Sequence, residues 1–426
     1  MTSSSSFGSG APTTVAAPTR SPLALAFLVA LALLLLVIVF GELRLPGTSV
    51  AIRYKILARA LPLAWLACWA LPAGRTTLPY RPTASDLPLA LFTLATGLSV
   101  ALGGGHWGDV RHLIAAIGVG LLARSLFAPV GRRVVLIAFF AATLITILGH
   151  ELRIHPNLLP PHETGRYDLV TANPNVLGFL FAMTAPLLLA AAFIQRGAWR
   201  WLATLGYAVA VLGVLLSFSR VAAVGLAAGS LMVIAYLPRP RRALTLATVA
   251  LLAFVATSRP DQWIQLRASG DGYRPSIMYT ALQIALEHPV LGVGFGINNL
   301  EEVFPDRYET LYGERIFRFH SGNQLLDLLA GTGLVGTGLA LWWAIRIGRT
   351  ALRHFRSATH PAARVTVAGG VGACLAIALM SMAEPPLYHG KLLPILFLVL
   401  AAVELGPEPE SPHADGTPGH LRSTPR

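Results

Sequence analysis

The sequence predicts an all-α polytopic membrane protein. Hydrophobic residues make up 54% of its 426 residues and charged residues only 12%, whereas about a quarter of a typical soluble domain is charged. Apolar runs recur along the whole chain, and each is long enough to cross a hydrocarbon core of about 30 Å. Together, these observations exclude an ordinary soluble domain.

The apolar runs predict about 12 transmembrane helices: 22–41, 56–73, 86–104, 111–128, 133–150, 174–194, 199–218, 221–237, 241–257, 323–347, 364–383 and 391–406. The first run is too long for a signal-peptide core, so we expect an uncleaved span. Residues 1–21 and 407–426 are rich in small and polar residues, which predicts two disordered termini.

The basic residues predict the orientation, because cytoplasmic loops of membrane proteins are enriched in Lys and Arg. Arginines gather in alternate loops: Arg75, Arg81, Arg132, Arg133, Arg196, Arg200, Arg239, Arg241, Arg242, Arg346, Arg349, Arg353 and Arg356. We therefore expect these loops and both termini in the cytoplasm. The net charge of +13 is explained mostly by this topology, and nothing indicates a nucleic-acid partner.

One connection is much longer than the others. Residues 258–322 separate spans 22–257 from spans 323–406 and hold eight of the chain's 20 acidic residues. A loop of this length is usually functional or disordered. The stretch "RPSIMYTALQIALEHP" has apolar residues at helical spacing and prolines at both ends, which predicts a helix. We expect a partly helical outer loop that carries part of the active site.

Three motifs follow one another in the second half of the chain. They are "LLSFSRVAAVGLAAG" with Arg220, "GYRPSIMYTALQIALEHPVLGVGFGINN" with Arg274, and "FHSGNQLLDLLAGTGLVGTGL" with His320. With "TANPNVLGF" upstream, their order resembles the O-antigen ligase and O-antigen polymerase family of bacterial inner-membrane glycosyltransferases, over roughly residues 165–345. In many members of this family the third motif has the sequence His-x-His-Asn. Here Gly322 replaces the second histidine, which leaves His320 as the candidate base at this place.

The resemblance implies a reaction and its partners. Such enzymes transfer a glycan from undecaprenyl diphosphate to a sugar hydroxyl of a second glycolipid, such as lipid A–core, on the periplasmic face of the inner membrane. They need no cofactor or metal. In this sequence no Asp-x-Asp pair precedes the C-terminal tail, and no His or Cys cluster has zinc-ligand spacing.

Two arginines are candidates for binding the departing diphosphate, because a guanidinium group keeps its charge and binds phosphate oxygens bidentately. Arg220 follows an apolar run directly, and Arg274 opens a predicted helix whose N–H groups also favour an anion. An ordinary role at the membrane surface would explain either residue alone. Arg53, Lys55 and Arg59 could contact the donor phosphates or anchor the surface.

Histidine suits the removal of a proton from the acceptor hydroxyl, since its ordinary pKa lies near neutrality. A capping box between Ser321 and Gln324 predicts that Ser321 caps the tenth span, but it gives His320 no structural role. We therefore predict His320 as the general base. Asn323 and Asp327 could orient its ring or bind the acceptor, and Glu384 beside "PPLYHG" is a further candidate partner.

Other functions remain open at this point. A polymerase of O-antigen or exopolysaccharide, or a pilin-directed oligosaccharyltransferase, would share the motifs. A transporter or flippase for the lipid-linked glycan would have two related halves and polar groups near the midplane. The chain shows no repeat between its halves, and its motifs gather at the outer edge, so we favour the enzyme and, within the family, the ligase.

Overall fold

The computed structural model describes residues 22–40, 42–44, 51–103, 105–130, 140–141, 144, 174–217, 219–237, 273–316 and 320–406. Within these ranges the regular structure is almost entirely helical, which confirms the predicted class. Five helices in the described part of the chain are long and apolar enough to cross a membrane. They are α4 (Asp86–Gly103), α7 (Pro174–Ile194), α8 (Gly197–Ser217), α14 (Gln324–Ser357) and α15 (Pro361–Met380).

The remaining predicted spans on described residues also coincide with helices: α1 (Pro22–Phe40), α2 (Tyr54–Ala70), α5 (Gly108–Val130), α9 (Arg220–Ile234) and α16 (Leu393–Leu405). The predicted spans 133–150 and 241–257 fall almost wholly outside the described residues, as do both termini. The number 12 and the orientation of the chain therefore stay predictions.

Two features of the fold differ from the sequence-based expectation. Two three-residue strands, β1 (Glu42–Arg44) and β2 (Ala51–Arg53), pair antiparallel ahead of α2. Helix α14 has 34 residues and is about 51 Å long, so it extends about ten residues beyond its predicted end. The apolar pattern stops near Arg346, but the polar residues after it continue the helix.

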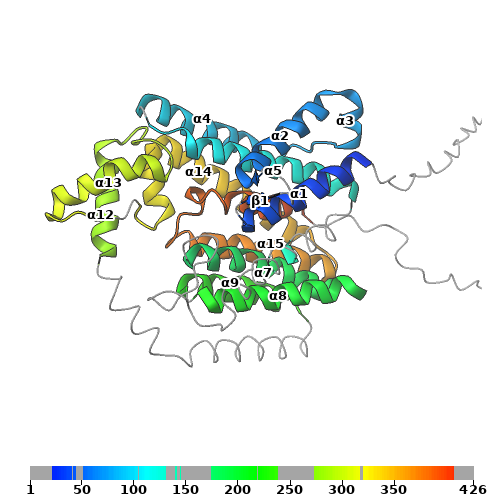
Figure 1. Ribbon diagram of the computed structural model, residues 1–426. Coiled ribbons are helices and arrows are strands. Elements are labelled where there is room, and N and C mark those ends of the chain that lie inside the picture. Colours follow the sequence, from blue (N-terminus) through cyan, green and yellow to red (C-terminus); the bar gives the residue numbers. More distant parts are fainter. Residues whose placement is uncertain are drawn as a thin grey trace, which may run out of the picture.

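Helices α7, α8, α9 and α15 form one packed group, which lies on one side of the molecule in Figure 1. Small residues allow this close packing. A methyl group added at Gly372 of α15 would collide with the backbone of Gly229 in α9, and one added at Gly229 would collide with Gly372. This small-residue contact is typical of membrane helices, where close backbone approach replaces hydrophobic burial as the source of association.

Helices α4, α5, α14 and α16 form the rest of the helical core. An aromatic stack joins three of them: the ring centroids of Phe92 and Trp343 lie 6.4 Å apart, and those of Trp343 and Phe397 lie 5.5 Å apart. Because α14 also packs against α15, it connects the two groups.

The described part of the outer loop is ordered and helical. Helix α12 (Arg274–Glu287) confirms the predicted helix, and α13 (Ile297–Tyr312) is an addition to it. Leu300, Phe304 and Tyr308 of α13 are buried at intervals of one helical turn. The two helices project from one end of the helical core (Figure 1).

A glycine-rich turn joins α12 to α13 and holds this hairpin on α14. Gly292, Gly294 and Gly296 all have positive φ angles, of 67°, 118° and 112°. The N–H groups of Val293 and Gly294 donate to the carbonyl oxygens of Ala330 and Gly331, each at 2.9 Å. The "GVGFG" segment is therefore a turn whose glycines allow its backbone to approach α14 closely.

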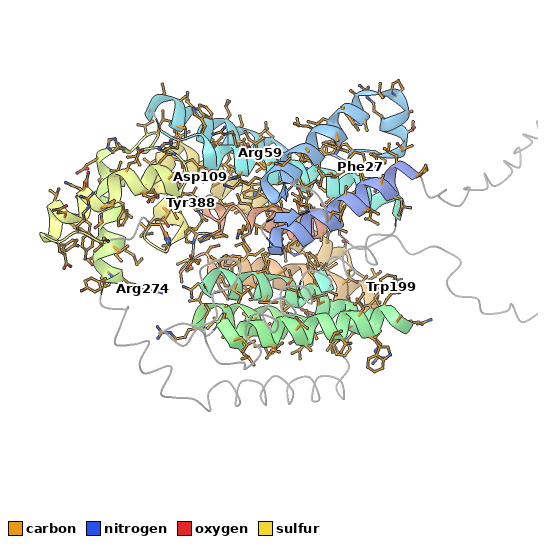
Figure 2. The ribbon with its side chains drawn as sticks, in the orientation of Figure 1. Phe27, Arg59, Asp109, Trp199, Arg274 and Tyr388 are labelled. Atoms are coloured by element: carbon orange, nitrogen blue, oxygen red, sulfur yellow. The ribbon has the colours of Figure 1, made fainter. Side chains whose placement is uncertain are left out.

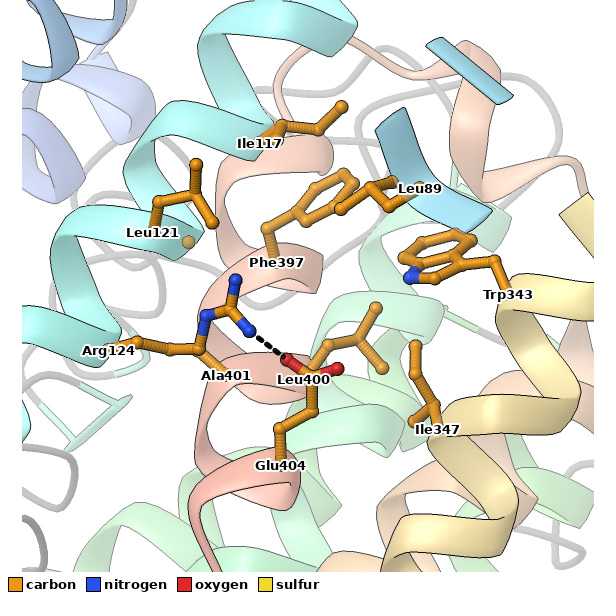
Figure 3. A pocket seen from close by; sticks show the side chains of 11 residues that line it. Leu89, Ile117, Leu121, Arg124, Trp343, Ile347, Phe397, Leu400, Ala401 and Glu404 are labelled. Carbon is orange, nitrogen blue, oxygen red and sulfur yellow. Dashed lines mark hydrogen bonds and ion pairs between the residues drawn. The ribbon is translucent and has the colours of Figure 1, made fainter. Parts of the chain in front are cut away.

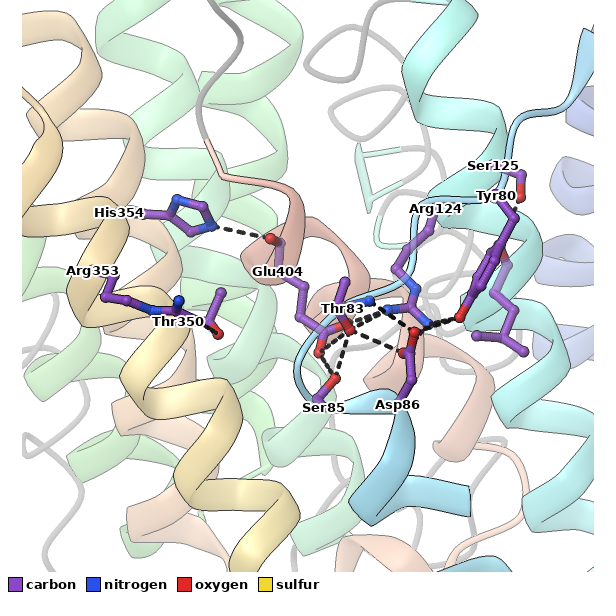
Figure 4. A network of polar contacts seen from close by, with 11 residues as sticks. Tyr80, Thr83, Ser85, Asp86, Arg124, Ser125, Thr350, Arg353, His354 and Glu404 are labelled. Carbon is purple, nitrogen blue, oxygen red and sulfur yellow. Dashed lines mark hydrogen bonds and ion pairs between the residues drawn. The ribbon is translucent and has the colours of Figure 1, made fainter. Parts of the chain in front are cut away.

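A buried ion network lies at the opposite end of α4, α5 and α16. Arg124 donates from Nη2 to Asp86 Oδ1 at 2.6 Å and from Nη1 to Glu404 Oε2 at 3.0 Å. Tyr80 and Thr83 complete the network (Figure 4). Arg124 and Glu404 also line a small cavity between α5, α14 and α16 (Figure 3). Every charge here has a partner within the protein, so this end of the structure serves to hold the helices together.

Candidate active site

Several helix ends meet at the end of the core from which α12 and α13 project. The N–H of Gln324, the first residue of α14, donates to the carbonyl oxygen of Ser381, just after α15, at 2.9 Å. A methyl group added at Gly225 in α9 would lie 2.9 Å from Met380. The starts of α9 and α14 and the segment 381–392 after α15 therefore lie side by side.

His320 is held by a turn that precedes α14. Gly322, at φ +76°, directs its N–H to Nδ1 of His320 at 3.0 Å. The side chain of Asn323 accepts from the N–H groups of Leu325 and Leu326. Asn323 is therefore the N-cap, and the prediction that Ser321 caps this helix is wrong, because α14 begins only at Gln324.

The predicted capping box fails because both of its members have other partners. Ser321 Oγ accepts from the N–H of Asn323 at 3.0 Å, and Gln324 Oε1 accepts from the N–H of Leu387 at 2.9 Å. The amide of Asn323 also donates to the carbonyl oxygen of Met382. These contacts give Asn323 a structural role, while its predicted contact with substrate stays a prediction.

Asp327 lies fully buried behind His320. Its Oδ1 accepts from the N–H of Ser321 at 2.7 Å, and its Oδ2 lies 3.9 Å from His320 Nδ1. Oδ2 has no hydrogen-bond partner in the described part of the chain. Asp327 thus lies next to the His320 ring, and a small ring rotation would allow Nδ1 to donate to Oδ2; its predicted role in orienting the ring or binding the acceptor stays a prediction.

Glu384 lies in the segment that follows α15 and contributes a second buried carboxylate near His320. Its Oε1 lies 2.9 Å from Nε2 of His389, and its Oε2 accepts from the amide of Asn175, at the start of α7, at 3.3 Å. Burial alone would raise the pKa of the Glu384 carboxyl. The hydrogen bond from His389, together with the attraction of the His389 and His320 imidazoles when they are protonated, outweighs burial and holds that pKa below its usual range.

His389 is the residue of this cluster that the sequence-based analysis missed. Its ring centroid lies 6.3 Å from that of His320, with the two rings nearly perpendicular. The available signal was its position five residues after Glu384 in "EPPLYHG". We call His320, Asp327, Glu384 and His389 the histidine–carboxylate cluster.

The two predicted phosphate-binding arginines each open a helix. Arg220 is the first residue of α9, which Ser219 caps by accepting from the N–H of Ala222. Arg274 is the first residue of α12 and projects from its start (Figure 2). Both side chains are exposed. That the two guanidinium groups converge on His320 stays a prediction.

A second group of cations lies on the other side of Tyr388. Lys55 and Arg59, on successive turns of α2, and Arg111 of α5 lie within electrostatic reach of His112. Lys55 is likewise within reach of Lys391, two residues after His389. Asp109 beside them accepts from the N–H and the amide of Asn298 at the start of α13.

Tyr388 connects these two regions. Its hydroxyl donates to the carbonyl oxygen of Asp327 at 2.6 Å, and its ring lies against Phe295, 5.1 Å between centroids. Arg59, Asp109 and Tyr388 are marked in Figure 2. Arg53 ends β2, and its side chain lies outside the described part of the structure.

The cluster can transfer protons and bind anions. It holds two imidazoles, two buried carboxylates and nearby cations, whereas no group of three or more metal-ligating side chains is found among the described residues. This arrangement suits removal of a proton from a hydroxyl group next to a negatively charged group.

Comparison with known proteins identifies one related family. The sequence model of a family described as O-Antigen ligase matches residues 205–341. This match includes Arg220, Arg274 and His320, together with the outer hairpin and the first half of α14; Lys55, Arg59 and Glu384 lie outside it. No curated protein sequence matches the chain significantly.

Proposed function

Because residues 205–341 match the O-antigen ligase family model, we propose that the chain belongs to this family and transfers a glycan from undecaprenyl diphosphate to a sugar hydroxyl of lipid A–core. We place the reaction on the periplasmic face of the bacterial inner membrane, the side that the sequence predicts for residues 258–322. The observation that carries the proposal is the histidine–carboxylate cluster, because its His320 lies inside the matched segment and beside two buried carboxylates.

In this reaction the acceptor oxygen attacks the anomeric carbon of the donor glycan. The bond from that carbon to the phosphate oxygen breaks, and its electron pair leaves with undecaprenyl diphosphate. His320 takes the proton of the attacking hydroxyl. Such general-base catalysis requires a lone pair that faces the substrate and a second ring atom that is held in place.

The surroundings of His320 support both requirements. While Nδ1 accepts from Gly322, the neutral ring carries its proton on Nε2. When Nδ1 instead donates to the unpartnered Oδ2 of Asp327, the lone pair moves to Nε2. Asp327 then orients the ring and stabilises the imidazolium that forms, as the carboxylate does in a catalytic triad.

Cations on two sides of the cluster bind the diphosphate. Arg220 and Arg274 each stand at a helix N-terminus, where backbone N–H groups add positive potential. Lys55 and Arg59 of α2 add further positive charge to the proposed donor site, and Arg53 remains a candidate from the sequence alone. Fixed positive charge stabilises the diphosphate most as it departs, when its negative charge is greatest.

A polymerase of the same family is the second candidate, because the family match does not distinguish a ligase from a polymerase. The two differ only in the acceptor, which is lipid A–core for a ligase and a second undecaprenyl-linked glycan for a polymerase. Supplying one acceptor at a time to the same preparation distinguishes them.

The test uses the full chain in liposomes with an undecaprenyl-diphosphate glycan and lipid A–core. We expect wild-type protein to form the new glycolipid and His320→Ala to lower its rate about 100-fold with donor binding retained. His106→Ala is the control, because His106 is exposed and pairs with Glu302 on the outer surface. Full activity in His320→Ala would remove the base assignment, and donor movement across the bilayer without bond formation would contradict the transferase.

A further inference from the structure

The histidine–carboxylate cluster contains a second imidazole that the family motif does not supply. His389 lies outside the matched residues 205–341 and comes from the segment between α15 and α16. Its ring stands 6.3 Å from the ring of His320, between centroids. Rings at this centroid separation are close enough for a single water molecule or sugar hydroxyl to bridge a nitrogen of one ring to a nitrogen of the other.

Glu384 fixes the orientation of the His389 ring. Its side chain is 6% exposed, and each of its carboxylate oxygens has a partner, His389 on one and Asn175 on the other. With Glu384 ionised, Nε2 of His389 must carry a proton to donate to it. The lone pair of the neutral ring is therefore on Nδ1, the atom that faces away from Glu384.

The two histidines are complementary as proton donor and acceptor. After His320 takes a proton from the acceptor hydroxyl, both of its ring nitrogens carry protons. The Nδ1 proton is held by Asp327, so the Nε2 proton is the one that must leave before the next turnover. Nδ1 of neutral His389, on a ring 6.3 Å from that of His320 between centroids, carries a lone pair that can accept it.

We propose that His389, held by Glu384, accepts this proton from His320 through a bridging water and releases it to solvent. This role rests on the proposed function of the site. His389 thus supplies from another segment the second imidazole that Gly322 replaces in the third motif. No other bond changes, and the positive charge on His389 is balanced by the carboxylate 2.9 Å away.

The test compares His389→Ala with wild-type protein in the liposome assay. We expect kcat to fall about 100-fold, KM for donor and acceptor to change less than about twofold, and added imidazole to restore much of the rate. Glu384→Gln keeps the size of the side chain but removes the charge, so its kcat also falls. His288→Ala is the control, because His288 is an exposed residue at the end of α12.

The outcomes separate this inference from the proposed function. If wild-type protein forms no glycolipid, the proposed function fails. If wild-type protein is active but His389→Ala keeps its kcat, or loses it without recovery in imidazole, the relay is wrong and the transferase stands. A rise in KM alone would assign His389 to substrate binding and would also overturn the relay.

Discussion

The N–H of Gly294 donates a hydrogen bond of 2.9 Å to the carbonyl oxygen of Gly331. This bond joins the outer hairpin to α14 one turn beyond Asp327. It exists because α14 is interrupted at Gly333, where φ is +61° and ψ is −164°, so carbonyl oxygens of the preceding turn are open to a partner. Irregular backbone near a membrane is tolerated where protein satisfies it in this way.

Gly333→Ala therefore tests whether this junction positions the site. An added methyl group would collide with the backbone of Val290, and the positive φ disfavours any side chain. We expect glycan transfer to fall at least about tenfold, since small displacements of reacting groups have large effects on rate. Gly338→Ala is the matched control in the same helix, because nothing lies within 4 Å of its added methyl group. Equal activities in the two variants would contradict the prediction.

Asn323→Ala removes the N-cap of α14. Because two N–H groups lose their acceptor, we expect the free energy of unfolding to fall by about 1–2 kcal/mol. Thermal unfolding in detergent measures this change. Ser321→Ala, which leaves the cap in place, should have the smaller effect, and the reverse order would restore Ser321 as the cap.

Arg124→Gln leaves Asp86 and Glu404 without their buried cation. We expect a loss of about 3–5 kcal/mol in unfolding free energy, the usual cost of breaking a buried ion pair from one side. Unfolding in denaturant measures it. Arg353→Gln is the control, because Arg353 is exposed and bonds only Thr350 among the described contacts. An equal loss of unfolding free energy in Arg353→Gln would contradict a special stabilising role for the Arg124 network.

Glu384 should make the protein sensitive to acid. Its folded pKa lies below the ordinary value of 4.5, so it contributes stability above about pH 4.5 that is lost as pH falls through the folded value. We expect the wild type to lose more stability than Glu384→Gln between pH 5 and the acid limit of the assay. Glu302→Gln, which replaces an exposed carboxylate in the same way, serves as the matched comparison.

Arg220→Ala and Arg274→Ala should each weaken donor binding and transfer about tenfold or more, because a charge-assisted bond to phosphate is lost. Titration with undecaprenyl diphosphate measures the first effect. Arg315→Ala is the control, since Arg315 is an exposed arginine of the same loop that pairs with Asp306. Unchanged binding in both variants would exclude these arginines from the phosphate site.

The helical class and most helix positions could be predicted from the sequence alone. Apolar runs are a local property of the chain, so they located α4, α7 and α15, and apolar spacing between two prolines located α12. Helix α13 was missed although Leu300, Phe304 and Tyr308 recur at turn spacing, because its residues are mostly polar and Pro305 interrupts them.

Contacts between residues far apart in the sequence could not be predicted from local patterns. His389 and Glu384 reach His320 because α15 returns the chain to the start of α14, and no local pattern encodes that return. Tertiary contacts also influence which residue caps α14. The N–H of Leu387 donates to the side chain of Gln324, and the amide of Asn323 donates to the carbonyl oxygen of Met382. Hydrogen bonds between segments some 60 residues apart thus set the geometry of the site, whereas the chemistry available to it was already present in the residues.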